Sequence, residues 1–269
     1  MSSVSSSGQP WLLTGKTAIV TGGSRGIGRA IAIQFARKGL DKIAITYASN
    51  GEAAEATLDE CRRLGVSKAI AIQAEVTDPQ FGPVIVQKAL QGLDTTTIDI
   101  VVNNASVGGL EYYRPVHETT PDVFLHLMHG NVYSAMSLTK ECMAHLPAKG
   151  GRVINISSVA SRLANPSPTF VHGAAKAALE SITRSFAGAF GVATGATFTS
   201  VSVGATDTDA FRAAGDIVPP EYLEAMMNEA TVEKRLGTPE DIAYIVGFLA
   251  SEERRRGGCR EPASVLTEG

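Results

Sequence analysis

Short apolar segments alternate with longer amphipathic segments along most of the chain. Apolar runs of strand length occupy residues 17–21, 42–47, 68–73, 98–102, 152–156 and 198–203. Helical patterns fill the intervals at 27–38, 52–64, 79–92, 120–145 and 170–190. Apolar strands separated by helices predict a parallel sheet that is covered on both faces. Right-handed crossovers then give a doubly wound α/β sheet of the Rossmann type.

The chain shows no internal repeat and no linker that would divide it. We therefore predict a disordered N-terminal tail at residues 1–13 and a single Rossmann-type domain at residues 14–269. A chain of 269 residues can bury a core of this kind without help from metals or disulfides.

Composition excludes several classes of protein. The 24 Lys and Arg residues against 27 Asp and Glu residues give a net charge of −3, which excludes a strongly basic nucleic-acid-binding surface. Three cysteines without a CxxC pair favour free thiols in a reducing compartment over a disulfide framework or a zinc site. No apolar run reaches the roughly 18 residues of a membrane helix, and the first ten residues do not resemble a signal peptide. We expect a cytoplasmic protein.

A glycine-rich loop joins the first predicted strand to the first helix. Its sequence is Thr21-Gly-Gly-Ser-Arg-Gly-Ile-Gly28, with the key glycines at Gly22, Gly26 and Gly28. Glycine permits the tight turn and lets backbone N–H groups approach a pyrophosphate at the positive end of a helix. At the first βα junction, this loop predicts a dinucleotide site.

The end of the second predicted strand selects the nucleotide. An acidic residue there would bind the ribose 2′-hydroxyl and favour NAD. The segment Thr46-Tyr-Ala-Ser-Asn50 carries no carboxylate, whereas Arg25 supplies positive charge and Ser49 and Asn50 supply hydrogen-bond donors. We therefore expect NADP(H).

These residues and several later motifs resemble the classical short-chain dehydrogenase/reductase family over nearly all of residues 14–251. The motifs, in family order and spacing, are TGGSRGIG at 21–28, Asn103-Asn104-Ala105, Asn131, Ile156-Ser157-Ser158 and Lys176. The resemblance implies an NAD(P)-dependent oxidoreductase, here of the type found in fungal secondary metabolism. It also implies a homodimer or homotetramer that packs through its two long helices.

The resemblance assigns roles to individual residues. Asn131 would order a water, Ser158 would hydrogen-bond the substrate oxygen, and Lys176 would hold the nicotinamide ribose. Thr208 would meet the carboxamide. No metal is implied. The cofactor contacts implied are Gly22, Ser24, Arg25, Gly26, Ile27, Gly28, Ala48, Ser49, Asn50, Glu75, Val76, Asn104, Ala105, Lys176, Gly204, Thr206 and Thr208.

One position departs from the family's active site. The family's YxxxK motif reads His172-Gly-Ala-Ala-Lys176, so a histidine stands where the catalytic tyrosine is expected. The spacing of four still places both side chains on one helical face, and no tyrosine lies between Tyr133 and Tyr222. Milder departures are Glu75 for the usual aspartate, Ser106 after the Asn-Asn-Ala motif, and Val203-Gly204 for the usual Pro-Gly.

Three interpretations of His172 remain open. It can be the proton donor of a carbonyl reductase, although the neighbouring Lys176 cation disfavours its protonated form. Alternatively, the acceptor is an iminium, which needs hydride and little acid help. In the third interpretation redox chemistry is lost, and the pocket catalyses an isomerisation, dehydration or cyclisation, or only senses NADP. Members of the family in fungal alkaloid pathways, with altered active sites, reduce an iminium and then guide a Diels–Alder cyclisation.

Two segments of low strand pattern flank the expected site. They are residues 161–170 and a lid at about 205–232 that carries Phe211, Ile217, Val218, Tyr222, Leu223, Met226 and Met227. An apolar lid predicts a mid-sized apolar substrate, such as a multi-ring or polyketide-like metabolite. His126 and His129 have no third ligand at helical spacing, so we predict packing rather than metal binding. Residues 264–267 are the candidate for the family's last strand.

Overall fold

The computed structural model describes residues 9–108, 110–112, 114–148, 150–165, 169–213, 224, 235–253 and 264–267. Much of the predicted lid, including Ile217 and Met226, therefore lies outside the described residues. The same holds for residues 1–8 of the predicted tail.

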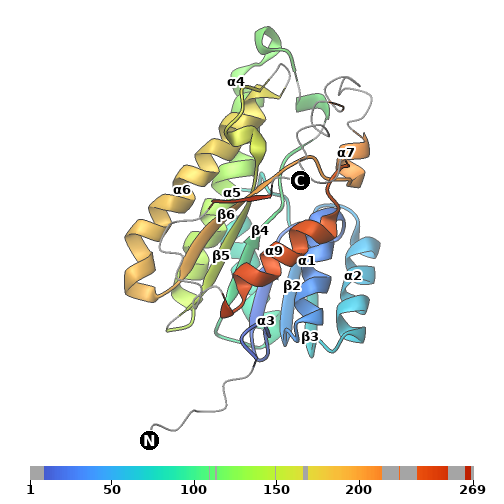
Figure 1. The fold of residues 1–269 in the computed structure, drawn as a ribbon, viewed down its shortest axis with the longest axis vertical. Helices are drawn as coiled ribbons and strands as arrows, with labels where there is room; N and C mark the ends of the chain where they lie inside the picture. The colour runs from blue at the N-terminus through green and yellow to red at the C-terminus, as the bar shows by residue number, and fades with distance from the viewer. Residues whose placement is uncertain are drawn as a thin grey trace, which may run out of the picture.

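A seven-stranded parallel sheet forms the centre of the molecule, in the order β3-β2-β1-β4-β5-β6-β7 (Figure 1). The order reverses between β1 and β4, as in a doubly wound sheet, which confirms the predicted fold class. The last strand pairs with β6, at the position predicted for residues 264–267. The strands are β1 (Thr17–Val20), β2 (Lys42–Tyr47), β3 (Lys68–Gln73), β4 (Ile100–Asn103), β5 (Arg152–Ser158), β6 (Thr197–Val203) and β7 (Ser264–Thr267).

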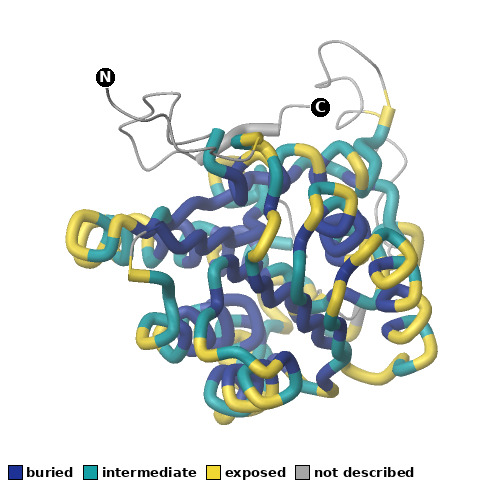
Figure 2. Tube along the Cα trace, turned by 90° about the horizontal axis from the view of Figure 1, so that it is seen from below, coloured by how far each residue is buried: buried dark blue, intermediate teal, exposed yellow. Residues whose placement is uncertain are grey.

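Helices cover both faces of this sheet. One apolar core cluster joins the sheet to α1, α2 and α9, and a second joins its other face to α3, α5 and α6. Strands β1, β4, β5 and β6 are accordingly almost entirely buried at the centre of the molecule (Figure 2). The helices are α1 (Gly26–Arg37), α2 (Gly51–Arg63), α3 (Phe81–Leu93), α4 (Pro121–Met128), α5 (Ser134–Cys142), α6 (Phe170–Thr194), α7 (Asp209–Ala213) and α9 (Pro239–Ala250).

The long helix predicted at 120–145 is interrupted. A π-helical turn at His129–Tyr133 separates α4 from α5, and a 3-10 turn follows at Met143–His145. A Cβ on Gly130 would overlap the Val107 side chain, so the loop after β4 packs directly against the π turn. Such turns are frequent at functional sites, and this one contains Asn131.

The predicted boundary of the N-terminal tail is wrong for the described residues 9–13. Leu13 is fully buried, and its N–H donates to Lys38 O at 2.8 Å. Pro10 O accepts a hydrogen bond from Glu252 N at 3.0 Å. This part of the segment is ordered because it packs on the domain, which its polar and proline-containing sequence did not indicate.

Candidate active site

The glycine loop forms a tight turn at the carboxyl end of β1. Gly22 and Gly26 have φ angles of 65° and 54°, which side-chain-bearing residues rarely adopt. Gly22 N donates to Thr46 Oγ1 at 3.0 Å, which ties the loop to β2. The N-cap residue of α1, Arg25, makes no side-chain cap hydrogen bond, whereas Asn50, Thr120 and Thr238 cap α2, α4 and α9. The first N–H groups of α1 are thus available for an anion.

The segment after β4 closes against this loop. Asn104 Nδ2 donates to Thr21 O at 2.9 Å and to Gly22 O at 3.2 Å. Ala105 N donates to Thr21 Oγ1 at 2.9 Å. A Cβ on Gly26 would lie 3.5 Å from the Thr208 methyl group, so the segment after β6 approaches the same loop. The structure therefore brings the predicted residues after β1, β4 and β6 to one edge of the sheet.

The residues predicted to select NADP(H) are exposed at the end of β2. Ala48, Ser49, Asn50 and Arg25 are all exposed. Asn50 Oδ1 accepts from Ala53 N at 2.9 Å as the cap of α2, which leaves its Nδ2 as a donor. Within the part of the chain that the structure describes, Arg25 forms no ion pair.

Glu75 and Val76, which are also predicted to contact the cofactor, lie after β3. Glu75 Oε1 accepts from Val76 N at 2.9 Å, so this carboxylate folds back on its own backbone. Val76 is buried.

Among the described residues, the α1 N-terminus has no side-chain cap and Arg25 forms no ion pair, and the end of β2 carries no carboxylate. These features fit an NADP phosphate group better than a ribose hydroxyl.

Lys176 is buried, and its side chain is fixed by a hydrogen bond to β5. It is 6% exposed, and its Nζ donates to Ile156 O at 3.0 Å, two residues before Ser158. Burial lowers the pKa of Lys176 to about 8. The ammonium group is thus fixed to β5 and is still mostly charged at pH 7.

His172 lies one turn before Lys176 on α6. Burial, and to a smaller extent the positive charge of Lys176, lowers the pKa of His172 to about 4. The imidazole is therefore neutral at physiological pH. Ser158 ends β5, and its Oγ accepts from Ala160 N at 3.2 Å, which leaves the hydroxyl proton available for a substrate.

Asn131 lies within the π turn and is 2% exposed. Its Nδ2 donates to Leu127 O at 2.9 Å and to Val107 O at 3.3 Å. Its buried Oδ1 has no hydrogen-bond partner among the described residues. A buried acceptor of this kind fits a bound water, which is the predicted role of Asn131.

The two histidines of α4 and the π turn are packing residues. His126 stacks on Tyr112, with 4.3 Å between ring centroids, and His129 meets Tyr133 edge-on, with 4.9 Å between ring centroids.

No group of three or more potential metal ligands occurs in the described ranges. No helix in those ranges is both long and apolar enough to span a bilayer. Glu180, a buried carboxylate that accepts hydrogen bonds from Ser157 and Ser161, was not predicted from the sequence.

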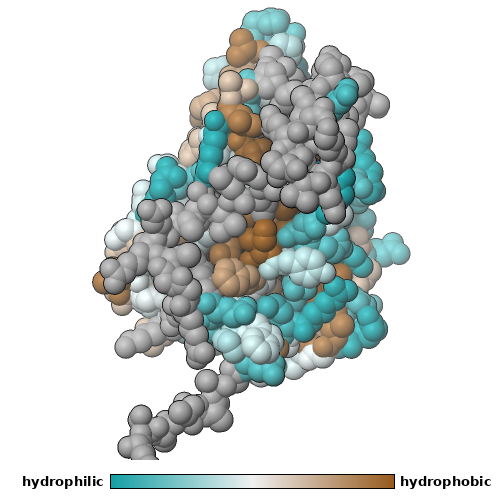
Figure 3. Space-filling view, viewed as in Figure 1, coloured by the Kyte–Doolittle hydropathy of each residue, from teal (hydrophilic) through white to brown (hydrophobic). Residues whose placement is uncertain are grey.

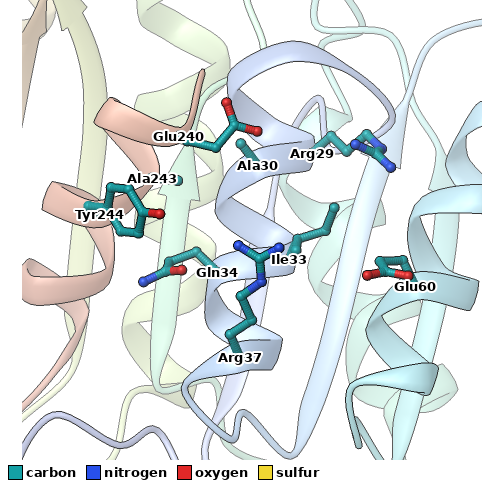
Figure 4. Close-up of a pocket in the computed structure, with 9 residues that line it drawn as sticks. All are labelled: Arg29, Ala30, Ile33, Gln34, Arg37, Glu60, Glu240, Ala243 and Tyr244. Atoms are coloured by element: carbon teal, nitrogen blue, oxygen red, sulfur yellow. The ribbon is translucent and has the colours of Figure 1, made fainter. Parts of the chain in front are cut away.

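A pocket of about 150 Å³ lies elsewhere, in the groove between α1, α2 and α9 (Figure 4). None of the predicted site residues lines it. Its lining is charge-balanced and consists of Arg29, Ala30, Ile33, Gln34, Arg37, Glu60, Glu240, Ala243 and Tyr244.

Comparison with known proteins identifies the family of the chain. Residues 22–256 match a family described as enoyl-(acyl carrier protein) reductase. The chain is 53% identical over 267 residues to the short chain dehydrogenase asqE of Emericella nidulans, covering 96% of this chain and 98% of that protein. It is 50% identical over 267 residues to the short chain dehydrogenase penD of Penicillium thymicola, covering 96% of each.

Solved structures give the same assignment. The crystal structure of the angucycline C-6 ketoreductase LanV with bound NADP has a TM-score of 0.80 and 33% identity, and the match covers 94% of each chain. The fold, the ordered motifs and these relatives together show that the chain belongs to the short-chain dehydrogenase/reductase family.

Proposed function

We propose that this protein is an NADPH-dependent reductase that transfers hydride to a ketone, imine or iminium carbon of a mid-sized apolar metabolite. The observation that carries the proposal is the arrangement of Lys176 and Ser158. Lys176 Nζ is anchored on Ile156 O, at the end of the strand that presents Ser158. NADPH supplies the hydride when bound, and the α1 N-terminus and Arg25 would hold its phosphates. The NADP bound to LanV supports this choice of cofactor.

Neutral His172 changes how the acceptor is activated. An imidazole with a pKa of about 4 is a poor proton donor at pH 7. A neutral imidazole can still donate an N–H hydrogen bond that polarises a substrate. An iminium already carries the required positive charge, so this site favours iminium reduction over ketone reduction. For a ketone, the proton would come from Lys176 or from water at Asn131.

The substrate class is inferred from the segments that are predicted to flank the site. Leu163, in the loop after β5, is 51% exposed and gives the described part of residues 161–170 one exposed apolar side chain. The angucycline substrate named for LanV is consistent with a multi-ring molecule. A fungal polyketide or alkaloid intermediate is the substrate type that we infer.

The proposal is tested by NADPH consumption with a panel of apolar ketones and cyclic iminium ions. Wild type, His172→Tyr and the surface control His145→Tyr are compared. We expect wild type to reduce iminium ions faster than ketones, and His172→Tyr to gain ketone reduction of about tenfold or more. If neither protein consumes NADPH although both bind it, the redox assignment is wrong.

A second function has one observation in its favour. The neutral, buried imidazole of His172 can act as a base, which suits isomerisation, dehydration or cyclisation with NADP as a scaffold. Product analysis in the absence of NADPH oxidation identifies this outcome. A silent NADP-binding regulator would show neither product.

We also propose a homodimer or homotetramer in the cytoplasm. Exposed apolar side chains lie on the described faces of α4, the π turn and α6, at Phe124, Leu125, Tyr133 and Phe190. Tyr244 and Phe248 of α9 are also exposed, and hydrophobic surface gathers over α9 (Figure 3). Apolar faces of this kind mark contacts between proteins. Light scattering after size-exclusion chromatography measures the oligomeric state.

A further inference from the structure

A buried carboxylate lies on the same helix as the predicted catalytic residues. Glu180 is one turn beyond Lys176 and two turns beyond His172 on α6. Its side chain is only 6% exposed. A carboxylate removed from water in this way requires hydrogen-bond donors around it.

Those donors come from both sides of Ser158. Glu180 Oε1 accepts from Ser157 Oγ at 2.9 Å and from Ser161 Oγ at 2.8 Å. Arg162 Nη2 lies 3.5 Å from Oε2. Ser157 directly precedes Ser158, and Ser161 ends the 3-10 turn Val159–Ser161 that follows it. One carboxylate therefore holds the strand end and the turn that together place Ser158.

The same turn is attached to α6 at a second point. Asn165 Nδ2 donates to Ala160 O at 2.7 Å. A Cβ on Gly173 would overlap the Asn165 amide and would lie 2.7 Å from Ala160 O, so the loop rests directly on α6 beside His172. Because Ser158 Oγ accepts from Ala160 N, the position of this oxygen depends on how the turn docks on the helix.

We propose that Glu180 is a positioning residue that holds Ser158 Oγ in register with His172 and Lys176. The inference rests on the proposed function for its kinetic consequence, but the docking itself does not. Glu180 acts through the hydroxyls of Ser157 and Ser161 and does not touch the substrate. The charge of Arg162, which is 36% exposed, completes the environment of the carboxylate.

The kinetic test compares Glu180→Gln and Glu180→Ala with the matched control Thr183→Val. Thr183 is also buried on α6, but it accepts from Asn155 Nδ2 and, among the described residues, forms no hydrogen bond with the Ser158 turn. We expect kcat to fall about tenfold for Glu180→Gln and about 100-fold for Glu180→Ala, because small misplacements of reacting groups have effects of this size. The Kd for NADPH should change less than about twofold, since Ile156 O still holds Lys176. Thr183→Val should keep its kcat.

A double-mutant cycle with Ser158→Ala separates positioning from general damage. If Glu180 acts through Ser158, Glu180→Ala lowers kcat by less than about twofold once Ser158 is absent. An equal loss in both backgrounds would overturn the proposal. So would an equal loss of kcat in Thr183→Val, or full activity of Ser158→Ala.

Hydrogen exchange tests whether Glu180 holds the Val159–Ser161 turn against α6, and this test does not depend on catalytic activity. The amides of Ala160 and Arg162 bond within the turn, to Ser158 Oγ and Val159 O. We expect them to exchange about tenfold faster in Glu180→Ala than in wild type, with no change in Thr183→Val. If wild type consumes no NADPH but this exchange pattern holds, the proposed function fails and the docking stands. Unchanged exchange in Glu180→Ala overturns the positioning role whatever the activity.

Discussion

Replacing Gly28 by alanine tests whether the loop after β1 depends on the close approach of its backbone. A Cβ on Gly28 would overlap the Gly22 carbonyl oxygen and would lie 2.6 Å from Asn104 Nδ2. Ordinary contacts are about 3.5–4 Å, so the loop or the Asn104 segment must move by roughly 1 Å. Overpacking of this kind costs about 1–3 kcal/mol.

This movement displaces the backbone N–H groups that we predict to bind the pyrophosphate. We therefore expect the Kd for NADPH to rise about 10- to 100-fold, which corresponds to about 1.4–2.7 kcal/mol. Quenching of protein fluorescence, or the change in NADPH fluorescence, measures this Kd. Urea unfolding measures the loss of stability in the same variant.

Gly188→Ala is the matched control for this substitution. Gly188 also lies within a helix, α6, but nothing lies within 4 Å of its added Cβ. Alanine there should raise the free energy of unfolding by about 0.5–1 kcal/mol and leave the Kd for NADPH unchanged. If Gly28→Ala binds NADPH as tightly as Gly188→Ala does, the loop is not a phosphate cradle and the reasoning is refuted.

Three further predictions concern charge. Arg25→Glu should raise the Kd for NADPH about 10- to 100-fold and change the Kd for NADH much less, because only NADPH carries the 2′-phosphate that Arg25 is expected to bind. Equal effects on both nucleotides would contradict the role of Arg25. Arg152→Met should lower the free energy of unfolding, measured in urea, by about 2–4 kcal/mol. The reason is that the buried guanidinium donates to Gly150 O, Gly151 O and Ser251 O. A decrease below about 0.5 kcal/mol in this free energy would show that water replaces these bonds. His172 is charged more easily in the unfolded chain, at its ordinary pKa of 6.5, than in the folded protein, where the pKa is about 4. Stability should therefore fall by up to about 3 kcal/mol as the pH drops from 6.5 to 4, and His172→Leu should flatten this part of the pH profile of urea unfolding.

The sequence predicted the sheet well because most of its strands are short runs rich in buried apolar residues. The bounds predicted for β2 and β3, at 42–47 and 68–73, are those of the structure. The doubly wound arrangement followed from the alternation with helices and from the handedness of crossovers. The loops of the candidate site then had to meet at the carboxyl edge of the sheet.

Features that depend on tertiary contact were not predictable in this way. The π turn at His129–Tyr133 leaves the apolar periodicity of 120–145 almost unchanged, and its packing involves Gly130 against Val107, far away in sequence. Glu180 resembles a residue of a solvent-facing helix surface until Ser157, Ser161 and Arg162 are seen around it. The low pKa of His172 depends on burial, which no spacing reveals.

The central claim is that hydride from NADPH reaches a substrate carbon at a site with a neutral His172. Its most direct test is transfer of deuterium from NADPH labelled at C4, with the product of a cyclic iminium analysed by mass spectrometry. We predict a product one mass unit heavier from one of the two C4-labelled forms, at a rate that does not fall between pH 6 and 7, where His172 stays neutral and Lys176 stays charged. Binding of NADPH with no deuterium in any product, and rearranged substrate instead, would contradict it.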